Sequence, residues 1–151
     1  YPYLLFATVK DIRLANISKT HKDCHHCQVW YIIAFFSSPI GAFRPLQNLA
    51  EGAAVDFYYE GNLVCWTEHG LEMIQCVSYN GTYVGPKMGV VTTDLISPDG
   101  LAIDWFTQKL YWTDGETNRI EVASITGEHR KVLIWSDIDQ PRAIALVPMK
   151  K

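Results

Sequence analysis

The chain has 151 residues, enough for one domain with a single packed core. Its 13 Lys and Arg against 16 Asp and Glu give a net charge of -3 at pH 7, without the basic excess that phosphate contacts require, so nucleic acid is a poor candidate partner. Hydrophobic residues make up 48% and charged residues 19%, which excludes a wholly disordered chain, and the 13% of aromatic residues favours strands over helices.

A cluster of Cys and His residues comes early in the chain. Its members are His21, Cys24, His25, His26 and Cys27. These are soft ligands that zinc accepts, but a closed structural site needs four ligands and no second half-site is present. A local disulfide or free thiols are the alternatives, and an insertion without an evolved role is favoured over both. We therefore predict neither a bound metal nor another cofactor.

The apolar run at residues 29–36 follows this cluster. It is uncharged and rich in β-forming side chains, so it predicts a strand or an aggregation-prone segment. A membrane helix needs roughly 20 apolar residues, and no segment of the chain approaches that length. We do not expect this chain itself to span a membrane.

A repeat with a period of about 45 residues occupies the rest of the chain. Residues 53–68 and 101–114 share one pattern, with an offset of 48 residues between their Asp positions and 46 between their Trp positions. A third repeat begins at residues 143–147. Periods of this length are typical of propellers and solenoids, and no window shows helical periodicity.

One period contains four short runs of β-forming residues, separated by turn residues such as Asp114-Gly115 and Thr126-Gly127. These runs are residues 101–105, 109–113, 119–124 and 130–134. Four strands per period, with Trp-Thr-Asp in the second, is the arrangement of a propeller blade. We predict two four-stranded blades, at about residues 50–95 and 98–138, each packed on its neighbour through Trp66 or Trp112, with almost no helix.

The second repeat resembles the YWTD repeat of the low-density lipoprotein receptor family. The resemblance begins with KLYWTDGETNRIEV at residues 109–122. Three further stretches narrow the resemblance to one branch of this family. They are SPDGLA at 97–102, DQPRAIAL at 139–146 and the opening LLFATVKDIRL at 4–14. These stretches are similar to the first extracellular propeller of the Wnt co-receptor low-density lipoprotein receptor-related proteins.

The resemblance implies an all-β fold, a partial YWTD-type β-propeller with about two complete four-stranded blades and parts of two others. Its segments are partial first-blade strands at 1–18, an unmatched insert at 19–47, propeller blades at 48–148 and a tail at 149–151. Family propellers have six blades, roughly 270 residues at this period. We therefore expect a truncated, open propeller.

The acidic residues Asp56, Asp104 and Asp114 recur at the period of the blades. Paired carboxylates can perform acid-base catalysis, but repetition at the blade period favours a structural role. Motifs for a nucleophile elbow, a phosphate-binding loop or a metal-binding helix are absent from the sequence, so we predict that the chain is not an enzyme.

The cysteines Cys65 and Cys76 fall on successive predicted strands, nearly opposite each other. A disulfide between them is geometrically possible. Buried strand cysteines are more often inert small hydrophobic residues, and we favour that interpretation.

The resemblance also implies the ligands, which are Wnt proteins or secreted Wnt antagonists with an Asn-x-Ile segment. Glu72 and Glu116 match acidic residues of the family's binding patch, and Arg142 matches a basic residue beside it. Val9 and residues 69–71 differ from the family pattern on this rim, and the pocket Asn of the fourth blade lies beyond the chain. The alternative for Glu72, Glu116 and Arg142 is that they are solvated turn residues without a ligand. The alternative for the whole chain is a non-binding structural fragment or decoy isoform.

Two glycosylation sequons begin at Asn16 and Asn80. Asn80-Gly81 is suited to an exposed hairpin turn, so Asn80 is predicted to be the better acceptor. Together with the family resemblance, the sequons predict that the chain is extracellular or at the cell surface. The resemblance also implies a longer parent chain that is anchored in the membrane.

Overall fold

The fold was determined as a computed structural model that describes residues 3–7, 11–16, 43–80 and 83–147. The cluster between His21 and Cys27, the apolar run at residues 29–36 and Val9 lie outside the described residues.

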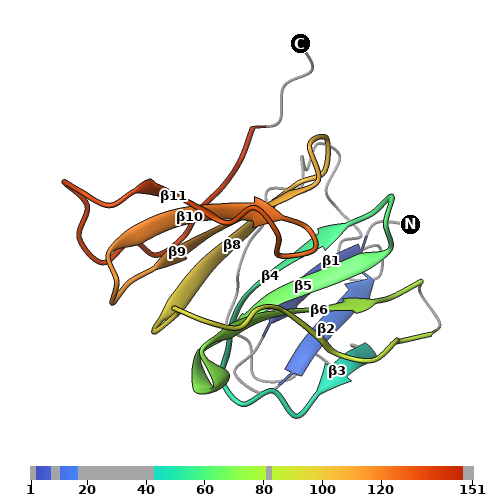
Figure 1. The fold of residues 1–151 in the computed structure, drawn as a ribbon. Coiled ribbons are helices and arrows are strands. Elements are labelled where there is room, and N and C mark those ends of the chain that lie inside the picture. Colours follow the sequence, from blue (N-terminus) through green and yellow to red (C-terminus); the bar gives the residue numbers. More distant parts are fainter. Residues whose placement is uncertain (1–2, 8–10, 17–42, 81–82, 148–151) are drawn as a thin grey trace, which may run out of the picture.

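Three antiparallel sheets make up the described chain (Figure 1). The first contains β1 (Tyr3–Ala7), β2 (Asp11–Asn16) and β3 (Phe43–Gln47). The second contains β4 (Gly52–Tyr58), β5 (Leu63–Glu68), β6 (Met73–Ser78) and β7 (Met88–Val91). The third contains β8 (Pro98–Asp104), β9 (Lys109–Asp114), β10 (Arg119–Ser124) and β11 (Lys131–Ile134). In each sheet the strands follow one another in chain order.

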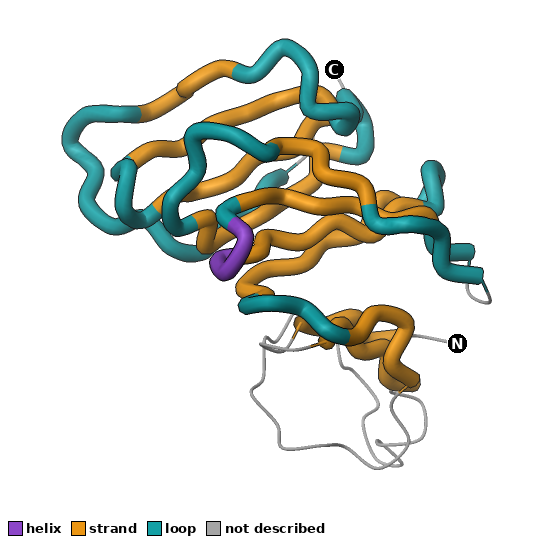
Figure 2. The backbone as a smooth tube through the Cα atoms, turned by 60° about the horizontal axis from the view of Figure 1, so that its bottom comes forward, coloured by secondary structure: helices purple, strands orange, loops and turns teal. Residues whose placement is uncertain are grey.

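This arrangement confirms the predicted blades, which span β4–β7 and β8–β11. Within the described ranges the only helical element is the short 3-10 turn η2 (His69–Leu71), drawn in purple between β5 and β6 in Figure 2. The first strands of the three sheets are neighbours in space, with β1 beside β4 and β4 beside β8. Sheets that meet through their first strands radiate from a common axis, which is the arrangement of a β-propeller.

The edge strand β3 lies inside the stretch that the sequence groups with the unmatched insert. It pairs with β2, so Asp11 lies opposite Gln47 and Ile12 opposite Leu46. Pro45 lies in this strand, and proline is tolerated in a sheet mainly on an edge, because it cannot donate a hydrogen bond to a neighbouring strand.

Two buried clusters join the sheets. The first lies between β4–β7 and β8–β11 and includes Ile74, Leu110 and Trp112, each 0% exposed. The second, which includes Ile12, Trp66 and Val77, lies between β1–β3 and β4–β7. Each signature Trp therefore fills the interface with the preceding sheet, and this packing fixes how the strand ends and their turns are presented.

Candidate ligand-binding rim

Glu72 and Glu116 lie in corresponding turns of the two blades. Each turn joins the second and third strands of its sheet, so both turns lie at the same end of their blades. Glu72 follows η2 with a left-handed backbone (φ 50°), and its N–H donates to the His69 carbonyl at 3.1 Å. Glu116 follows Gly115 directly after β9. Both side chains are exposed, which leaves their carboxylates available to a ligand.

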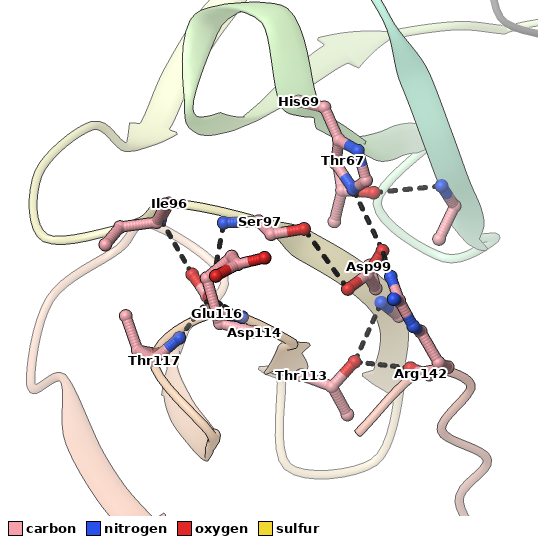
Figure 3. A network of polar contacts seen from close by, with 12 residues as sticks. Thr67, His69, Ile96, Ser97, Asp99, Thr113, Asp114, Glu116, Thr117 and Arg142 are labelled. Carbon is pink, nitrogen blue, oxygen red and sulfur yellow. Dashed lines mark hydrogen bonds and ion pairs between the residues drawn. The ribbon is translucent and has the colours of Figure 1, made fainter. Parts of the chain in front are cut away.

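Asp114 fixes the turn that carries Glu116. Its Oδ1 accepts hydrogen bonds from the backbone N–H groups of Ser97, Glu116 and Thr117 at 3.0–3.2 Å, and its Oδ2 accepts one from Ile96 at 2.9 Å (Figure 3). Burial alone would raise the pKa of Asp114, but these four hydrogen bonds to the charged form lower it. Asp114 is buried and fully engaged with backbone, as the predicted structural role requires.

A polar cluster joins the two blades beside this turn. Asp99, near the start of β8, accepts a hydrogen bond from Arg142 Nη1 at 2.9 Å, and His69 Nε2 of η2 lies 3.1 Å from the same oxygen (Figure 3). The Asp99 side chain is only 10% exposed, whereas that of Arg142 is 63% exposed. Asp99 thus holds the Arg142 guanidinium at the surface, close to the turn of Glu116.

Close packing brings Arg142 to this position. A Cβ on Gly115 would lie 2.5 Å from Asp99 Oδ2, so a side chain there would displace the carboxylate that holds Arg142. The Thr113 hydroxyl donates to the Arg142 carbonyl and accepts from the N–H of Gly100. These contacts tie the segment after β11 to the first two strands of the second blade.

The structure therefore places Arg142, held by Asp99, beside Gly115 in the turn that carries Glu116, while Glu72 lies on the neighbouring blade in the same turn as His69. Sequence reasoning missed Asp99 as a member of this cluster. In the sequence, Asp99 is only one residue of the stretch at 97–102 that carries the family resemblance, and no local signal links it to His69, 30 positions before it, or to Arg142, 43 positions after it.

The two sequons differ in their placement. Asn80 is exposed, and its Oδ1 accepts a hydrogen bond from the Tyr83 N–H at 2.9 Å in the connection between β6 and β7. Asn16 is the last residue of β2, and its side chain lies outside the described residues.

The interpretation of Cys65 and Cys76 as inert thiols is wrong, because the structure contains a disulfide between them. They are directly opposite in the pairing of β5 with β6, with Cα atoms 4.1 Å apart. The exact strand register, which the sequence left approximate, makes the bond possible. Among the residues that the structure describes, no group of three or more His, Cys, Asp and Glu is arranged to hold a metal ion. The same residues include no helix with the length and hydropathy needed to cross a bilayer.

Comparison with known proteins defines the class of this fold. Residues 108–147 match the family model for the low-density lipoprotein receptor repeat class B. In the crystal structure of a nidogen/laminin complex, a chain superposes with a TM-score of 0.74 at 26% identity, over 93% of this chain and 47% of that one. A luciferin-regenerating enzyme shares the fold at 14% identity, with a TM-score of 0.62 over 91% of this chain and 40% of its own. The chain therefore contains a low-density lipoprotein receptor class B repeat and forms part of a YWTD β-propeller.

Within this family the chain is similar to low-density lipoprotein receptor-related protein 5. It is 44% identical over 147 residues to the protein of Mus musculus and 43% identical over 147 residues to that of Homo sapiens. Each alignment covers 97% of this chain but 8% of the relative.

Proposed function

We propose that this chain is an extracellular, ligand-binding part of a Wnt co-receptor. The rim formed by Glu72, Glu116 and Arg142 captures Wnt proteins or secreted Wnt antagonists. The similarity to low-density lipoprotein receptor-related protein 5 supports the class of partner and the extracellular location. As in that class of receptor, the parent chain is anchored in the membrane.

The observation that carries the proposal is the pairing of exposed carboxylates on adjacent blades. Glu72 and Glu116 occupy corresponding turns at one end of the sheets. Within the described residues, neither glutamate side chain makes a hydrogen bond that holds its turn; backbone N–H groups and Asp114 do so instead. Carboxylates that a turn does not use remain free to attract a basic side chain on a partner loop.

Arg142 adds a fixed donor to this acidic rim. Its guanidinium is held by Asp99 through Nη1, and its side chain remains 63% exposed. A peptide with a basic residue beside an amide-bearing residue, such as the Asn-x-Ile segment of a secreted antagonist, complements carboxylates next to a guanidinium.

The test is calorimetric titration of an antagonist peptide that contains Asn-x-Ile. A charge-assisted contact contributes roughly 1.5 to 3 kcal/mol, so Glu72→Ala with Glu116→Ala should weaken binding about tenfold or more and reduce its salt dependence. The matched control is Glu60→Ala with Glu128→Ala, because both residues are exposed in turns at the opposite end of the same blades. Equal affinity of the rim variant and the control variant would remove both glutamates from the site.

A further inference from the structure

A pocket of about 290 Å³ lies at the outer edge of the second blade, where β11 is the edge strand (Figure 1). Four side chains line it: Thr117 and Arg119, which flank the start of β10, and Val132 and Trp135, which belong to β11 and the segment directly after it. A hydrogen bond of 2.7 Å from the N–H at position 140 to the side-chain oxygen at position 118 ties this segment to the β9–β10 turn. The two walls of the pocket are therefore held together.

The strand register places the pocket on one side of the sheet. Val132 lies opposite Glu121, and Arg119 precedes Glu121 by two residues on β10, so both side chains lie on the side of Glu121 and Trp112. This side packs on β4–β7, which leaves the edge strand uncovered. The next blade of a propeller packs on the opposite side of the sheet, so the pocket stays open in a longer parent chain.

Two hydrogen-bonding groups in the pocket have no partner in the part of the chain that the structure describes. The Thr117 hydroxyl is buried and makes no hydrogen bond. The exposed Arg119 side chain forms no ion pair there, whereas Arg130 and Arg142 are each held by a carboxylate. A buried hydroxyl without a partner, beside a guanidinium without a counter-charge, favours a ligand that accepts hydrogen bonds and is negatively charged.

The other wall of the pocket is apolar. Trp135 is 69% exposed and Val132 is half-buried. An exposed indole ring offers a flat surface on which an aliphatic side chain can pack, and Trp and Arg are enriched among the residues that dominate the energy of protein interfaces. The composition of the two walls therefore fits an anionic group with an apolar neighbour.

The first blade lacks these groups at the corresponding positions. The strand registers align Arg119 with Met73 and, one position beyond the paired strands, Trp135 with Thr92. The repeat thus forms the same four-stranded sheet without a cation or a tryptophan at these two places. The blade architecture does not require Arg119 and Trp135, which supports a role in binding.

We propose that this pocket binds an acidic side chain next to an apolar residue of a partner protein. The carboxylate accepts hydrogen bonds from the Arg119 guanidinium and the Thr117 hydroxyl, while the apolar side chain packs on Trp135 and Val132. The pocket is separate from the rim, whose glutamates attract basic groups, and the proposal does not rest on the function assigned to that rim.

Nuclear magnetic resonance titration of the isotope-labelled 151-residue chain with the blocked dipeptide N-acetyl-Leu-Glu-amide tests the proposal. We expect the dipeptide to shift the indole N–H resonance of Trp135 and to saturate with a roughly millimolar dissociation constant, as suits a ligand of this size. The neutral N-acetyl-Leu-Gln-amide should bind about tenfold more weakly or less, because it lacks the charge that pairs with Arg119.

Arg119→Gln should weaken binding of the acidic dipeptide by about tenfold or more. The matched control is Lys131→Gln, which removes the same charge from an exposed side chain opposite Val122, on the other side of the sheet. It should change the affinity by less than about twofold, since exposed charges at a distance are screened by salt. Arg119 is itself exposed, so its variant should fold, as an otherwise unchanged spectrum would verify.

Two further variants separate the contributions. Trp135→Ala, followed through the backbone N–H resonance of Thr117, should abolish the preference for N-acetyl-Leu-Glu-amide over N-acetyl-Gly-Glu-amide. Glu72→Ala with Glu116→Ala should leave binding of the acidic dipeptide intact, so the pocket and the rim can fail independently. Equal affinity for the acidic and neutral dipeptides, or equal effects of the Arg119 variant and its lysine control, would overturn the proposal. Inorganic sulfate that shifts the same resonances as strongly would also overturn it, because the pocket would then be a general anion site.

Discussion

The blade of β4–β7 and the blade of β8–β11 have the same strand order and register, but different side chains hold them together. In the second blade, Arg130 forms a two-point ion pair with Glu121, with Nε to Oε2 at 2.7 Å and Nη2 to Oε1 at 2.9 Å. Arg130 also donates to the carbonyls of Thr93 and Asp94 and lies 5.3 Å from the Trp112 ring centroid. These hydrogen bonds to Glu121 raise the pKa of Arg130.

The first blade has Lys87 and Gln75 at the corresponding positions. Lys87 Nζ lies 5.9 Å from the Trp66 ring centroid. Its hydrogen bonds to the carbonyls of Gln47 and Asn48 are long, at 3.4 and 3.5 Å. Gln75 Oε1 has no hydrogen-bond partner among the residues that the structure describes. What the first blade has instead is the Cys65–Cys76 disulfide. The same arrangement of four strands is thus stabilised in one blade by an ion pair with a buried carboxylate and in the other by a covalent link between its two middle strands.

The largest expected effect follows from breaking the ion pair of the second blade. Glu121 is 2% exposed, so Arg130→Ala leaves a buried carboxylate without its partner and should lower the free energy of unfolding by about 3 to 5 kcal/mol. Lys87→Ala in the first blade should cost less than about 1 kcal/mol. Urea unfolding at one fixed protein concentration measures both.

A second variant sharpens this result. Arg130→Lys with Glu121→Gln copies the first blade into the second and should cost less than Arg130→Ala, because it leaves no buried carboxylate without a partner. Equal losses for Arg130→Ala and Lys87→Ala would show that the two blades do not differ in the proposed way.

The disulfide is the next largest contribution. Cys65→Val with Cys76→Val keeps the volume of the pair but removes the link, which closes a loop over a sequence separation of 11 residues. Constraint of the unfolded chain by a loop of that size is worth about 3 kcal/mol. We expect a reductant to lower the stability of the parent chain by a similar amount and that of the double variant not at all. A double variant as stable as the oxidised parent would contradict this.

Opposite pH dependence should distinguish Asp56 from Asp104, which occupy corresponding positions in the two blades. Burial raises the pKa of Asp56, despite hydrogen bonds from the N–H groups of Ile103 and Phe57. Desolvation alone would also raise the pKa of Asp104, but the hydroxyl and N–H of Thr107 and the N–H of Phe106 lower it. Because the pKa of Asp56 is raised in the folded state, this residue stabilises the fold at pH values below its ordinary pKa of 3.8. That contribution is lost as the pH rises through the raised pKa. Because the pKa of Asp104 is lowered in the folded state, this residue stabilises the fold at pH values above 3.8. That contribution is lost as the pH falls through the lowered pKa.

The free energy of unfolding from pH 7 to pH 2 tests this difference. Relative to Asp56→Asn, the parent chain should gain stability as pH falls toward 3.8. Relative to Asp104→Asn, its advantage should hold at neutral pH and shrink below 3.8. Parallel profiles of the two variants would contradict the assigned environments.

The smallest effect on stability is expected from glycosylation at Asn80, whose sequon has no counterpart in the second blade. Asn80-Gly81-Thr82 corresponds to Thr126-Gly127-Glu128 in the second blade, which is not a sequon. On secretion we expect Asn80 to be glycosylated, because it is exposed in a turn. Mass spectrometry of Asn80→Gln should show the loss of one glycan, with Asn16→Gln as the comparison. An unchanged mass for secreted Asn80→Gln would count against the prediction.

The sequence by itself determined the blades of this protein. The spacing of Asp56 to Asp104 and of Trp66 to Trp112 reports a repeat, and turn residues divide each repeat into four strands. These signals are local, since each strand is a short run of residues followed by its own turn-forming residues. They can therefore be recognised in the sequence without knowing how the neighbouring sheets pack. The resemblance to the family added Glu72, Glu116 and Arg142 as candidates, whose turns the local pattern had already located.

Only the tertiary structure decided how distant segments meet. The disulfide of Cys65 with Cys76 depends on a register that is exact to one residue, which composition does not specify. The cluster of Asp99 with His69 and Arg142 unites three segments through the packing of blades. Asp56 and Asp104 are the same residue type at the same point of the repeat, yet their pKa values shift in opposite directions. Asp56 is partly buried and accepts a hydrogen bond from Ile103 of β8, whereas Asp104 accepts hydrogen bonds within its own turn. A repeated sequence gives equivalent positions, but the neighbour that packs on each position decides its chemistry.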